Sequence, residues 1–425
     1  MTGIVRVIEK LPRYHDNPGF FRVADYLKAQ DIDPGAFAVI LGGTNGKGSL
    51  GVMLESILAE AGISAGCFRS PHVYSFYERI TINRQPISPD DFHASAVRVL
   101  DYFSRAGVSP TFSDVLTGIA YTHFARARCR VMLMEVGMGG LHDPVNALPR
   151  QLTLITNIGH DHSHVLGSYP LQIARRKAAI VRPGVPLITA EKKPAVLDVF
   201  REICANQDAP LMVADRTSVT GVDVGGTRFV YQGREYATAL CGVQQGDNAA
   251  MAIEGIKVMR RFFNIHPDSV LQGLSKARLP WRMEVFCRNP GIIFDGSHNR
   301  ESWENLADTL SAFSFRNLHI ILCIQKLKNP QDFPRHMPGG EVFVYLPRCG
   351  GRFHSPGDIA QSLSPRWKAT THGGLPGAVD KALNMMSRDD LLVFAGSFGI
   401  ASRVRKIIKG RLTRDKVELA YPGGI

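Results

Sequence analysis

Short apolar segments alternate along this chain with segments whose apolar residues recur every three or four positions. The apolar segments that we expect to form strands are FAVIL at 37–41, VMLMEVG at 131–137, LTLITNIG at 152–159, GIIFDGS at 291–297, LHIILCI at 318–324, EVFVYL at 341–346 and LLVFAGS at 391–397. Alternation of buried strands with amphipathic helices is typical of parallel sheets covered by helices on both faces. The pattern therefore predicts an α/β fold with mostly parallel sheets.

A different pattern occupies residues 215–240. There TRFVY and REYATA flank Gln232-Gly233, and two β-compatible runs around such a dipeptide favour an antiparallel hairpin. We expect the sheet to be mixed at this point.

The length of 425 residues exceeds the size at which a single hydrophobic core stops growing, so we expect two domains. A polar step that contains a proline, Cys287-Arg288-Asn289-Pro290, lies between WRMEVF and the next strand. We place the boundary there, with one domain at 1–287 and the other at 288–425.

The segment LGGTNGKGSL at 41–50 follows the first predicted strand and precedes a helix whose apolar residues are Leu50, Met53, Leu54, Ile57 and Leu58. It departs from the usual phosphate-loop template, because Leu41 replaces the first glycine and Gly48 follows the lysine. The order of strand, glycine turn and helix still favours phosphate binding. Glycines let backbone N–H groups approach anionic oxygens, and Lys47 can reach the terminal phosphates. The alternative is a glycine turn with a solvated lysine.

Composition narrows the class of protein. The chain is 44% hydrophobic and 21% charged, no run of eighteen apolar residues occurs, and the first residues lack an apolar signal core, so we expect a cytoplasmic globular protein. The seven cysteines are scattered and form no CxxC pair, which argues against a disulfide framework or a zinc site and favours packing roles. The formal charge of +12 favours an anionic partner such as a nucleotide, a polycarboxylate or nucleic acid.

The spelling of the loop, GTNGKGS at 43–49, resembles the nucleotide loop of the Mur ligase superfamily and, within it, the folylpolyglutamate synthase / dihydrofolate synthase family. Further segments agree in order and spacing: RSPHVYSFYERITINRQPIS at 69–88, EVGMGGLHDPVN at 135–146, ITNIGHDHSHVLG at 155–167, IARRKAAIVRPGVP at 173–186, QQGDNAAMAI at 244–253, WRMEVF at 281–286, FDGSHN at 294–299 and GSFG at 396–399.

The resemblance implies a P-loop ATPase domain with a mostly parallel sheet, followed by a Rossmann-like domain that presents an amino acid. It also implies an ADP-forming amide ligase, in which ATP phosphorylates an acceptor carboxylate and an amino-acid amine attacks the acyl phosphate. Such chemistry demands cations and Mg²⁺ ions, two of them in this family, to neutralise the phosphate oxygens. The expected partners are a small acid and an amino acid, L-glutamate if the enzyme is of the folate type. We expect no nucleic-acid or membrane partner, and a monomer.

The resemblance assigns nucleotide contacts residue by residue. Asn248 matches an asparagine near the adenine, while Arg282, Asp295 and His298 match residues that close over the nucleotide from the carboxy-terminal side. The loop itself supplies Gly43, Thr44, Asn45, Gly46, Lys47, Gly48 and Ser49. A linker salt bridge for Arg282 and a helix N-cap for Asp295 are the structural alternatives.

Three residues match the family's metal ligands. Glu135 ends a predicted strand, and a carboxylate at the carboxyl end of a parallel strand suits Mg²⁺. Ser70 and His162 are the further ligands that the resemblance implies. The alternatives are a capping role for Glu135, a turn at Ser70-Pro71, and a zinc or nickel site in GHDHSH at 159–164.

Lys177 matches a lysine that is carbamylated in many members of the family, which turns a cation into an anion that orients a metal ion. The neighbouring Arg176 and Ala179 differ from the usual Glu and Gly of that segment. A plain cationic lysine is the alternative. Together Lys47, Glu135, His162 and Lys177 are the residues that we expect to carry catalysis.

Departures from the family pattern spare the nucleotide machinery. They are LHDPVN at 141–146 in place of Arg-Leu-Asp-Ala-Thr-Asn, QKL at 325–327 in place of Asp-Lys-Asp, and FSD at 112–114 where an aromatic-acidic step is expected. These changes leave open a related ligase that joins a non-folate acid to an amine.

Two other classes of protein would each explain one feature of the sequence. A nucleic-acid-binding protein would account for the charge, but no basic cluster interleaved with aromatic residues occurs. A nucleotide-driven switch would account for the loop, yet not for the second domain or the Lys177 segment. Measurement of ADP release distinguishes these classes. A ligase releases ADP rapidly only when acceptor and amine are both present, whereas a switch hydrolyses nucleotide without them and a nucleic-acid ATPase responds to DNA or RNA.

Overall fold

The computed structural model describes residues 3–13, 19–31, 35–159, 167, 169–288 and 290–412. The chain forms two compact units: Met1–Thr217 with Asp247–Ala277, and Ser218–Gly246 with Arg278–Ile425. The second unit thus starts at Arg278, before the domain boundary that we expected after Cys287, and it also includes residues 218–246. The reason is pairing, because the strand that ends at Cys287 is hydrogen-bonded to the next strand of the second unit. The assignment of ATP-binding and amino-acid-presenting roles to the two parts stays a prediction.

An eight-stranded sheet forms the centre of the first unit, in the order β4-β3-β2-β5-β1-β6-β7-β8. The six strands β2, β5, β1, β6, β7 and β8 are parallel to one another. Strands β3 and β4 extend the sheet beyond β2 as an antiparallel edge. The strands are β1 (Phe37–Gly42), β2 (Ala65–Phe68), β3 (Ile80–Ile82), β4 (Gln85–Pro86), β5 (Val131–Glu135), β6 (Leu152–Ile155), β7 (Leu187–Thr189) and β8 (Leu211–Val213). The predicted strands at 37–41, 131–137 and 152–159 are confirmed, with earlier ends for the last two.

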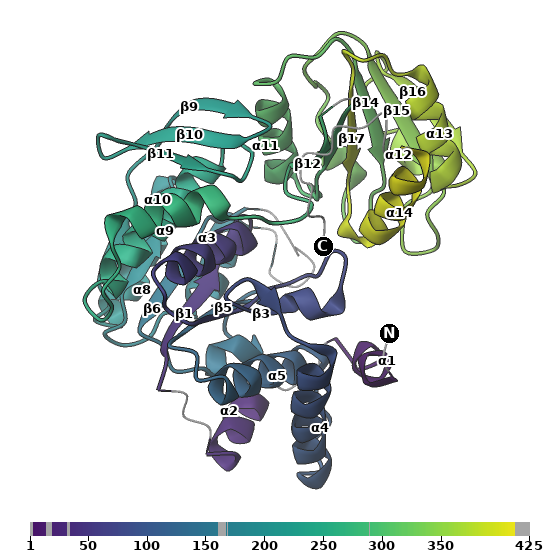
Figure 1. The fold of residues 1–425 in the computed structure, drawn as a ribbon. Helices are drawn as coiled ribbons and strands as arrows, with labels where there is room; N and C mark the ends of the chain where they lie inside the picture. The colour runs from purple at the N-terminus through teal and green to yellow at the C-terminus, as the bar shows by residue number, and fades with distance from the viewer. Residues whose placement is uncertain are drawn as a thin grey trace. The chain divides into compact units, whose positions relative to one another are not determined.

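Helices flank this sheet (Figure 1). They are α1 (Gly3–Glu9), α2 (Gly19–Ala29), α3 (Lys47–Glu60), α4 (Pro89–Arg105), α5 (Phe112–Arg126), α7 (Pro170–Ala178), α8 (Pro194–Asn206), α9 (Gln245–Met259) and α10 (Pro267–Lys276), with short 3-10 turns at Phe76–Arg79 and Pro144–Ala147. Residues 49–58 of α3 are buried on every side, because the helix lies between the sheet and α10. In the part of the chain that the structure describes, no helix is long and apolar enough to cross a membrane.

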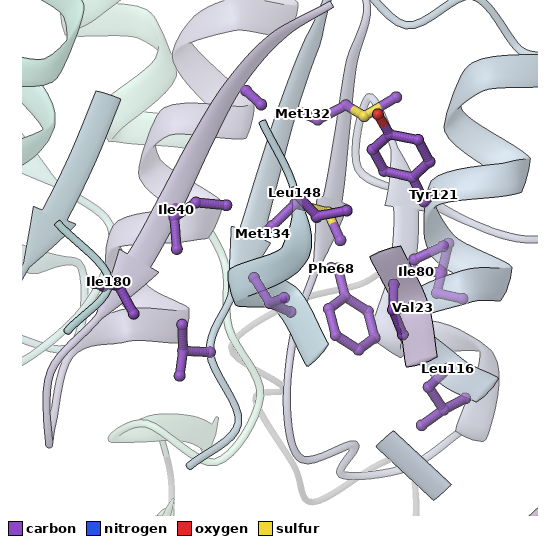
Figure 2. Close-up of a cluster of buried hydrophobic side chains, with 14 of the residues drawn as sticks. Val23, Ile40, Phe68, Ile80, Leu116, Tyr121, Met132, Met134, Leu148 and Ile180 are labelled. Carbon is purple, nitrogen blue, oxygen red and sulfur yellow. The ribbon is translucent and has the colours of Figure 1, made fainter. Parts of the chain in front are cut away.

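One large hydrophobic core stabilises the first unit. Ile40 of β1, Phe68 of β2 and Met134 of β5 are buried in it. Figure 2 shows these side chains together with Leu116 and Tyr121, which come from α5. All residues of β1 and β5 are buried, as expected for parallel strands that are covered on both faces.

The predicted hairpin around Gln232-Gly233 is confirmed. Strands β10 (Gly226–Tyr231) and β11 (Arg234–Thr238) pair antiparallel, and both turn residues have positive φ, as the tightest hairpin turns require. With β9 (Ser218–Asp223) they form a separate three-stranded antiparallel sheet. The expectation of a mixed sheet at this point was wrong, because the hairpin hydrogen-bonds to β9 instead of to a parallel strand.

The second unit contains a six-stranded sheet in the order β12-β13-β17-β14-β15-β16, parallel except for β12. Its strands are β12 (Glu284–Cys287), β13 (Gly291–Phe294), β14 (Leu318–Leu322), β15 (Val342–Pro347), β16 (Lys368–His372) and β17 (Leu391–Ala395). Its helices are α11 (Arg300–Leu310), α12 (Pro356–Ala360), α13 (Leu375–Met385) and α14 (Ala401–Arg411), with 3-10 turns at Pro330–Asp332 and Phe398–Ile400. The four apolar segments predicted as strands after residue 290 are confirmed.

Candidate active site

Four segments of the first unit meet where parallel strands end. β2, β5, β1 and β6 are consecutive in the sheet, and Ser70, Glu135, the loop 43–46 and the segment 156–159 follow or end these strands. The register pairs Leu41 with Glu135, so the glycine loop begins directly beside the Glu135 carboxylate. Ligands bind at this edge in open α/β sheets, because the loops there are carried by rigid, buried strands.

Two glycines give the loop its shape. Gly43 has φ 119° and Gly46 has φ 88°, both in the region that glycine alone enters readily. A Cβ atom at Gly43 would lie 2.0 Å from Oγ1 of Thr156, and one at Gly46 would lie 2.4 Å from Oδ1 of Asn248. The close approach of Asn248 places this residue, which we expected near the adenine, against the loop.

Residues Thr156 and Asn157, which follow β6, hydrogen-bond to the glycine loop. The N–H of Thr44 donates to the carbonyl of Asn157 at 2.8 Å, and the N–H of Asn45 donates to Oδ1 of the same residue at 3.0 Å. The hydroxyl of Thr156 donates to the carbonyl of Asn45 at 2.6 Å. These bonds fix the loop before any ligand arrives, so its ordering costs little when a phosphate binds.

Helix α3 starts at the lysine of the loop. Its N-cap is Gly46, which has no side chain to cap the first turn, and Ser49 is buried in that turn. The partial positive charge of a helix N-terminus favours an anion at this position. The predicted order of strand, glycine turn and helix is therefore present.

Two lysine side chains meet at one carbonyl of the loop. Nζ of Lys47 donates to the carbonyls of Gly43 and Thr44, at 3.1 Å each. Nζ of Lys177 donates to the same Gly43 carbonyl at 2.8 Å, and the Lys177 residue is only 4% exposed. The Nζ atoms of Lys47 and of Lys177, which belongs to α7, therefore both lie at the loop.

Helix α7 brings Lys177 to the loop through a second tight contact. A Cβ atom at Gly140, in the EVGMGG segment, would lie 2.5 Å from the carbonyl oxygen of Arg176 and 2.9 Å from that of Lys177. The Arg176 residue is exposed, whereas Lys177 is buried, because neighbouring residues of a helix point in different directions. The exposed Arg176 does not share the buried position of Lys177.

Ser70 and Glu135 lie together beside a buried arginine. The N–H of Ser70 donates to Oε2 of Glu135 at 3.4 Å, and Nη1 of Arg79 donates to the Ser70 hydroxyl at 3.3 Å. Nε of Arg79 donates to Nδ1 of His72 at 2.9 Å. Burial, with a smaller contribution from Arg13, lowers the pKa of Arg79 to about 10, so it stays cationic at neutral pH. Burial and the two arginines lower the pKa of His72 to about 4.

Aromatic rings complete this cluster. The Arg13 guanidinium carbon lies 3.7 Å from the centroid of the Phe112 ring, and that of Arg79 lies 5.3 Å from the same centroid. Phe76 packs edge-on against Phe112. These cation–π contacts bring two guanidinium groups and aromatic rings together, with Arg79 and Phe112 both buried. The sequence analysis missed Arg13 and Arg79 as site residues, although Arg79 stands within the RSPHVYSFYER segment.

The acidic residues of the divergent segments serve the local fold. Asp114 accepts the N–H of Thr111 at the start of α5 and pairs with Nε of Arg22 at 2.7 Å. Asp143 accepts hydrogen bonds from the N–H groups of Gly137, Met138 and Val145. Burial raises the pKa of Asp143 to about 6, although those three N–H groups act to lower it.

Two of the three residues expected in the second unit, Arg282 and His298, lie at one aromatic ring. The Arg282 guanidinium carbon lies 4.8 Å from the centroid of Phe398, and the His298 ring lies 6.1 Å from it. A Cβ atom at Gly296 would lie 2.2 Å from the same ring. The carboxylate of Asp295 accepts the N–H groups of Met283 and Ser297, while Asn299 is the N-cap of α11. The segments WRMEVF, FDGSHN and GSFG therefore converge, and Phe398 is a residue that the sequence analysis did not single out.

His162 and its neighbours Asp161, His160 and His164 lie outside the described residues, so the proposed ligand His162 and the zinc or nickel alternative have no structural account. Within the described ranges, no group of three His, Cys, Asp or Glu side chains is arranged to hold a metal ion. Of the remaining sequence-predicted residues, the loop 43–49, Ser70, Glu135, Lys177 and Asn248 lie in the first unit, and Arg282, Asp295 and His298 lie in the second.

Comparisons with known proteins agree with this arrangement. No model of a protein family matches the sequence. The chain is 33% identical over 304 residues to the dihydrofolate synthase/folylpolyglutamate synthase of Bacillus subtilis, which covers 68% of this chain and 70% of that protein.

Solved structures of such enzymes share the fold. A folylpolyglutamate synthase of Mycobacterium tuberculosis, complexed with ADP and AMPPCP, superposes with a TM-score of 0.84 at 25% identity, over 95% of this chain and 97% of that chain. A bifunctional folylpolyglutamate synthase/dihydrofolate synthase with Mn, AMPPNP and L-glutamate bound gives a TM-score of 0.81 at 25% identity, over 95% and 97%. The fold, the glycine loop and these similarities show that the chain belongs to the dihydrofolate synthase/folylpolyglutamate synthase family of ADP-forming ligases.

Proposed function

We propose that this enzyme phosphorylates the carboxylate of a folate-type acid with ATP and couples the acyl phosphate to the amine of L-glutamate, releasing ADP and phosphate. The observation that carries the proposal is the loop 43–49, whose Gly43 carbonyl accepts from both Lys47 and Lys177. The relatives favour the folate reaction over the non-folate alternative.

The loop accounts for binding of the triphosphate. The backbone around Gly43 and Gly46 leaves no room for side chains and presents the N-terminus of α3 to the phosphates. Lys47 would turn from the loop carbonyls toward the transferring phosphoryl group, where its charge stabilises the negative charge that develops in the transition state.

The residues of the first unit fit a divalent cation, which we propose to be Mg²⁺. The Glu135 carboxylate is 3% exposed, lies next to Ser70 and offers the oxygen ligands that hard cations prefer. Ser70 would contribute its hydroxyl, and His162 would hold a second ion. A bound metal ion would neutralise phosphate oxygens and so allow the acceptor carboxylate to approach.

Lys177 has two chemical options at its buried position. As a carbamate it would present an anion that orients the second metal ion, as the family segment implies. As an ammonium it would add positive charge next to the phosphates. We propose the carbamate, because the buried Lys177 lies at the loop while the Arg176 residue is exposed.

The acceptor would bind at the cluster of Arg13, Arg79 and Phe112. Arg79 lies next to Ser70 and Glu135, so a carboxylate paired with its guanidinium would lie close to the phosphoryl group.

The second unit would present the amino acid. Gln325 follows β14 and donates from Nε2 to the Ser397 hydroxyl at 2.9 Å, in the position where the family pattern has an acidic residue. Arg282, Asp295 and His298 would contact the nucleotide. We further propose that the enzyme acts as a monomer in the cytoplasm, where ATP is supplied.

ADP release tests the reaction. Purified protein with ATP and Mg²⁺ should form ADP rapidly only when dihydropteroate or a folate and L-glutamate are both present. Omission of either substrate should leave a slow background. Equal rates without the amine would overturn the ligase assignment, and a response only to an unrelated acid would overturn the folate assignment.

The variant Lys47→Ala tests the role of the loop in the same assay. Loss of one charge contact to the transferring group typically costs about 3–4 kcal/mol, so the rate should fall by roughly 10²–10³ with the fold retained. The exposed Lys28→Ala variant on α2 should keep wild-type activity. Amide formation at the wild-type rate by folded Lys47→Ala would exclude the proposed role of the loop.

A further inference from the structure

Two cysteines of the second unit lie in contact. Sγ of Cys323 and Sγ of Cys349 are 3.0 Å apart, although 26 residues separate them along the chain. The structure describes all seven cysteines; six of them are buried, and Cys349 is the partly exposed one. The other five fit the packing role expected from the sequence, whereas this pair places two thiols within bonding reach.

The pair is held between two neighbouring parallel strands. Cys323 follows β14 directly, and its N–H donates to the carbonyl of Ala395 in β17 at 3.1 Å. Cys349 lies just after β15, which pairs with β14. The two residues therefore follow neighbouring strands, and their side chains bring the sulfurs to 3.0 Å from each other.

Backbone bonds tie the two loops together beyond the thiols. The N–H of Lys326 donates to the carbonyl of Arg352 at 3.0 Å, and the N–H of His354 donates to the carbonyl of Ile324 at 2.9 Å. Gln325 and Phe353 form an isolated antiparallel bridge. Because both loops are already fastened to each other, a bond between the sulfurs needs little movement of the backbone.

The surroundings distinguish the two thiols. Cys349 lies in the loop 348–352, whose other residues are exposed, so a small oxidant reaches it. The hydrogen bond from Cys323 and the charge of Arg403 lower the pKa of Cys349, which favours the reactive thiolate. Cys323 is fully buried, and its contact with Cys349, followed by burial, raises its pKa well above the usual range. Cys349 is therefore the attacking sulfur and Cys323 the resolving one.

We infer that Cys323 and Cys349 form a reversible disulfide when the enzyme meets hydrogen peroxide. The Cys349 thiolate attacks one peroxide oxygen, the O–O bond breaks, and hydroxide leaves and takes up a proton. The sulfur of Cys323 then attacks the resulting sulfenic sulfur, and its proton leaves with the displaced hydroxide as water. Two thiols are oxidised by two electrons, one peroxide is reduced to two waters, and a dithiol reductant restores the pair.

The disulfide would pin the loop that carries Gln325. That residue lies two positions after Cys323 and donates to Ser397, next to Gly396, where a Cβ atom would lie 2.3 Å from the Cys323 carbonyl oxygen. This consequence rests on the proposed function, in which the loop meets the incoming amino acid. Oxidation should then raise KM for L-glutamate severalfold and leave KM for ATP unchanged.

Peptide mapping tests the bond independently of activity. After treatment with hydrogen peroxide, blocking of remaining thiols and digestion with trypsin, NLHIILCIQK (317–326) should appear linked to CGGR (349–352), and dithiothreitol should separate them. In Cys323→Ser, a sulfenic acid at Cys349 should be trapped by dimedone, and in Cys349→Ser no linked peptide should form. The Cys204→Ser variant, changed at a buried cysteine of α8, should behave as wild type.

Two results would overturn the inference. If the folded wild type keeps both thiols under peroxide, or if CGGR is found linked to another cysteine, the pair is not a modification site. Formation of the predicted link without any change in KM for L-glutamate would retain the site and remove its effect on catalysis. Absence of ligase activity with the link still formed would count against the proposed function alone.

Discussion

At the scale of single residues, polar side chains in this enzyme are occupied by local contacts before they meet any substrate. Asp114 caps α5 and pairs with Arg22, and Asp143 holds the turn at 137–145. Glu135, Ser70 and Lys177, by contrast, lie at the carboxyl edge of the first sheet around the glycine loop. The position of a residue relative to that edge, more than its chemical type, separates structural from catalytic candidates.

The enzyme should lose its ligase activity when Lys177 is replaced by either alanine or arginine. If it is carbamylated, Lys177→Ala should have almost no activity, partly restored by a small carboxylic acid that supplies the missing anion. Lys177→Arg should stay inactive, because arginine remains cationic and cannot be carbamylated. ADP formation with both substrates is the measurement, and the exposed Arg176→Ala variant of the same helix is the control. Full activity of Lys177→Arg would show that a plain cation suffices.

His72 should make the enzyme less stable in mild acid. Its pKa is lowered to about 4, chiefly by burial, whereas the unfolded chain titrates near 6.5, so the unfolded state binds the proton first. The contribution to stability is complete above pH 6.5 and is lost as the pH falls through 6.5 toward 4. Between pH 7 and pH 5 we expect a loss of about 2 kcal/mol from this group.

Urea unfolding of wild type and His72→Gln at both pH values measures that loss. The variant should show a smaller decrease between pH 7 and pH 5, by about the same 2 kcal/mol. His93→Gln, changed at an exposed position of α4, should follow the wild type. Parallel decreases in wild type and His72→Gln would rule out His72 as the source.

At the scale of elements, the glycine loop at 43–46 depends on how α3 is packed. The helix begins at Lys47 and is buried along its length, and α10 approaches it closely at Gly273. A Cβ atom there would lie 2.4 Å from Cα of Ile57. The glycine is needed because backbone atoms of α3 stand where a side chain would be.

Gly273→Ala should therefore destabilise the first unit. Overpacking of this kind costs about 1–3 kcal/mol, and here the helix that starts at the loop must move to relieve it. The free energy of unfolding and the KM for ATP are the measurements, and both should worsen. Gly377→Ala in α13, where a Cβ atom meets open space, should change stability by at most about 1 kcal/mol, in the stabilising direction. A neutral Gly273→Ala would contradict the close packing of α3 and α10.

At the scale of the whole molecule, the charge of +12 matches substrates that are all anions. ATP, a folate-type acid and glutamate each carry negative charge, so a cationic enzyme attracts them over a distance set by the Debye length.

Salt should therefore weaken substrate capture more than catalysis. Raising NaCl from about 50 mM to about 500 mM shortens the Debye length severalfold, so KM for ATP should rise severalfold while kcat changes less. Initial rates across the salt series give both constants, and circular dichroism at each concentration checks that the fold persists. A KM that stays constant over this range would show that long-range attraction contributes nothing.

The sequence by itself determined the elements of this protein that depend on local rules. Buried parallel strands need apolar residues on both faces, so β1, β5, β6, β13, β14, β15 and β17 were visible as continuous apolar runs. The hairpin at Gln232-Gly233 and the glycine loop depend on backbone conformations that few residues adopt, and so they were also visible.

Strands without such signals were not predicted. β2 (Ala65–Phe68) contains a glycine, and its apolar run is short. β16 (Lys368–His372) is an edge strand whose residues are mostly exposed and polar, because no neighbour covers its outer side. The division between the units also escaped the sequence, since it depends on which strands pair and not on the composition of the linking segment.

Only the tertiary structure decided which distant residues meet. Lys177 reaches the carbonyl of Gly43, 134 residues earlier, because α7 packs on the EVGMGG segment beside the loop. Arg79 reaches Ser70 because β3 starts beside the end of β2 in an antiparallel pair, and Cys323 reaches Cys349 because each follows one of two neighbouring parallel strands. Periodicity and glycine content are properties of short segments, whereas these contacts depend on strand order and register, which join segments far apart in the chain.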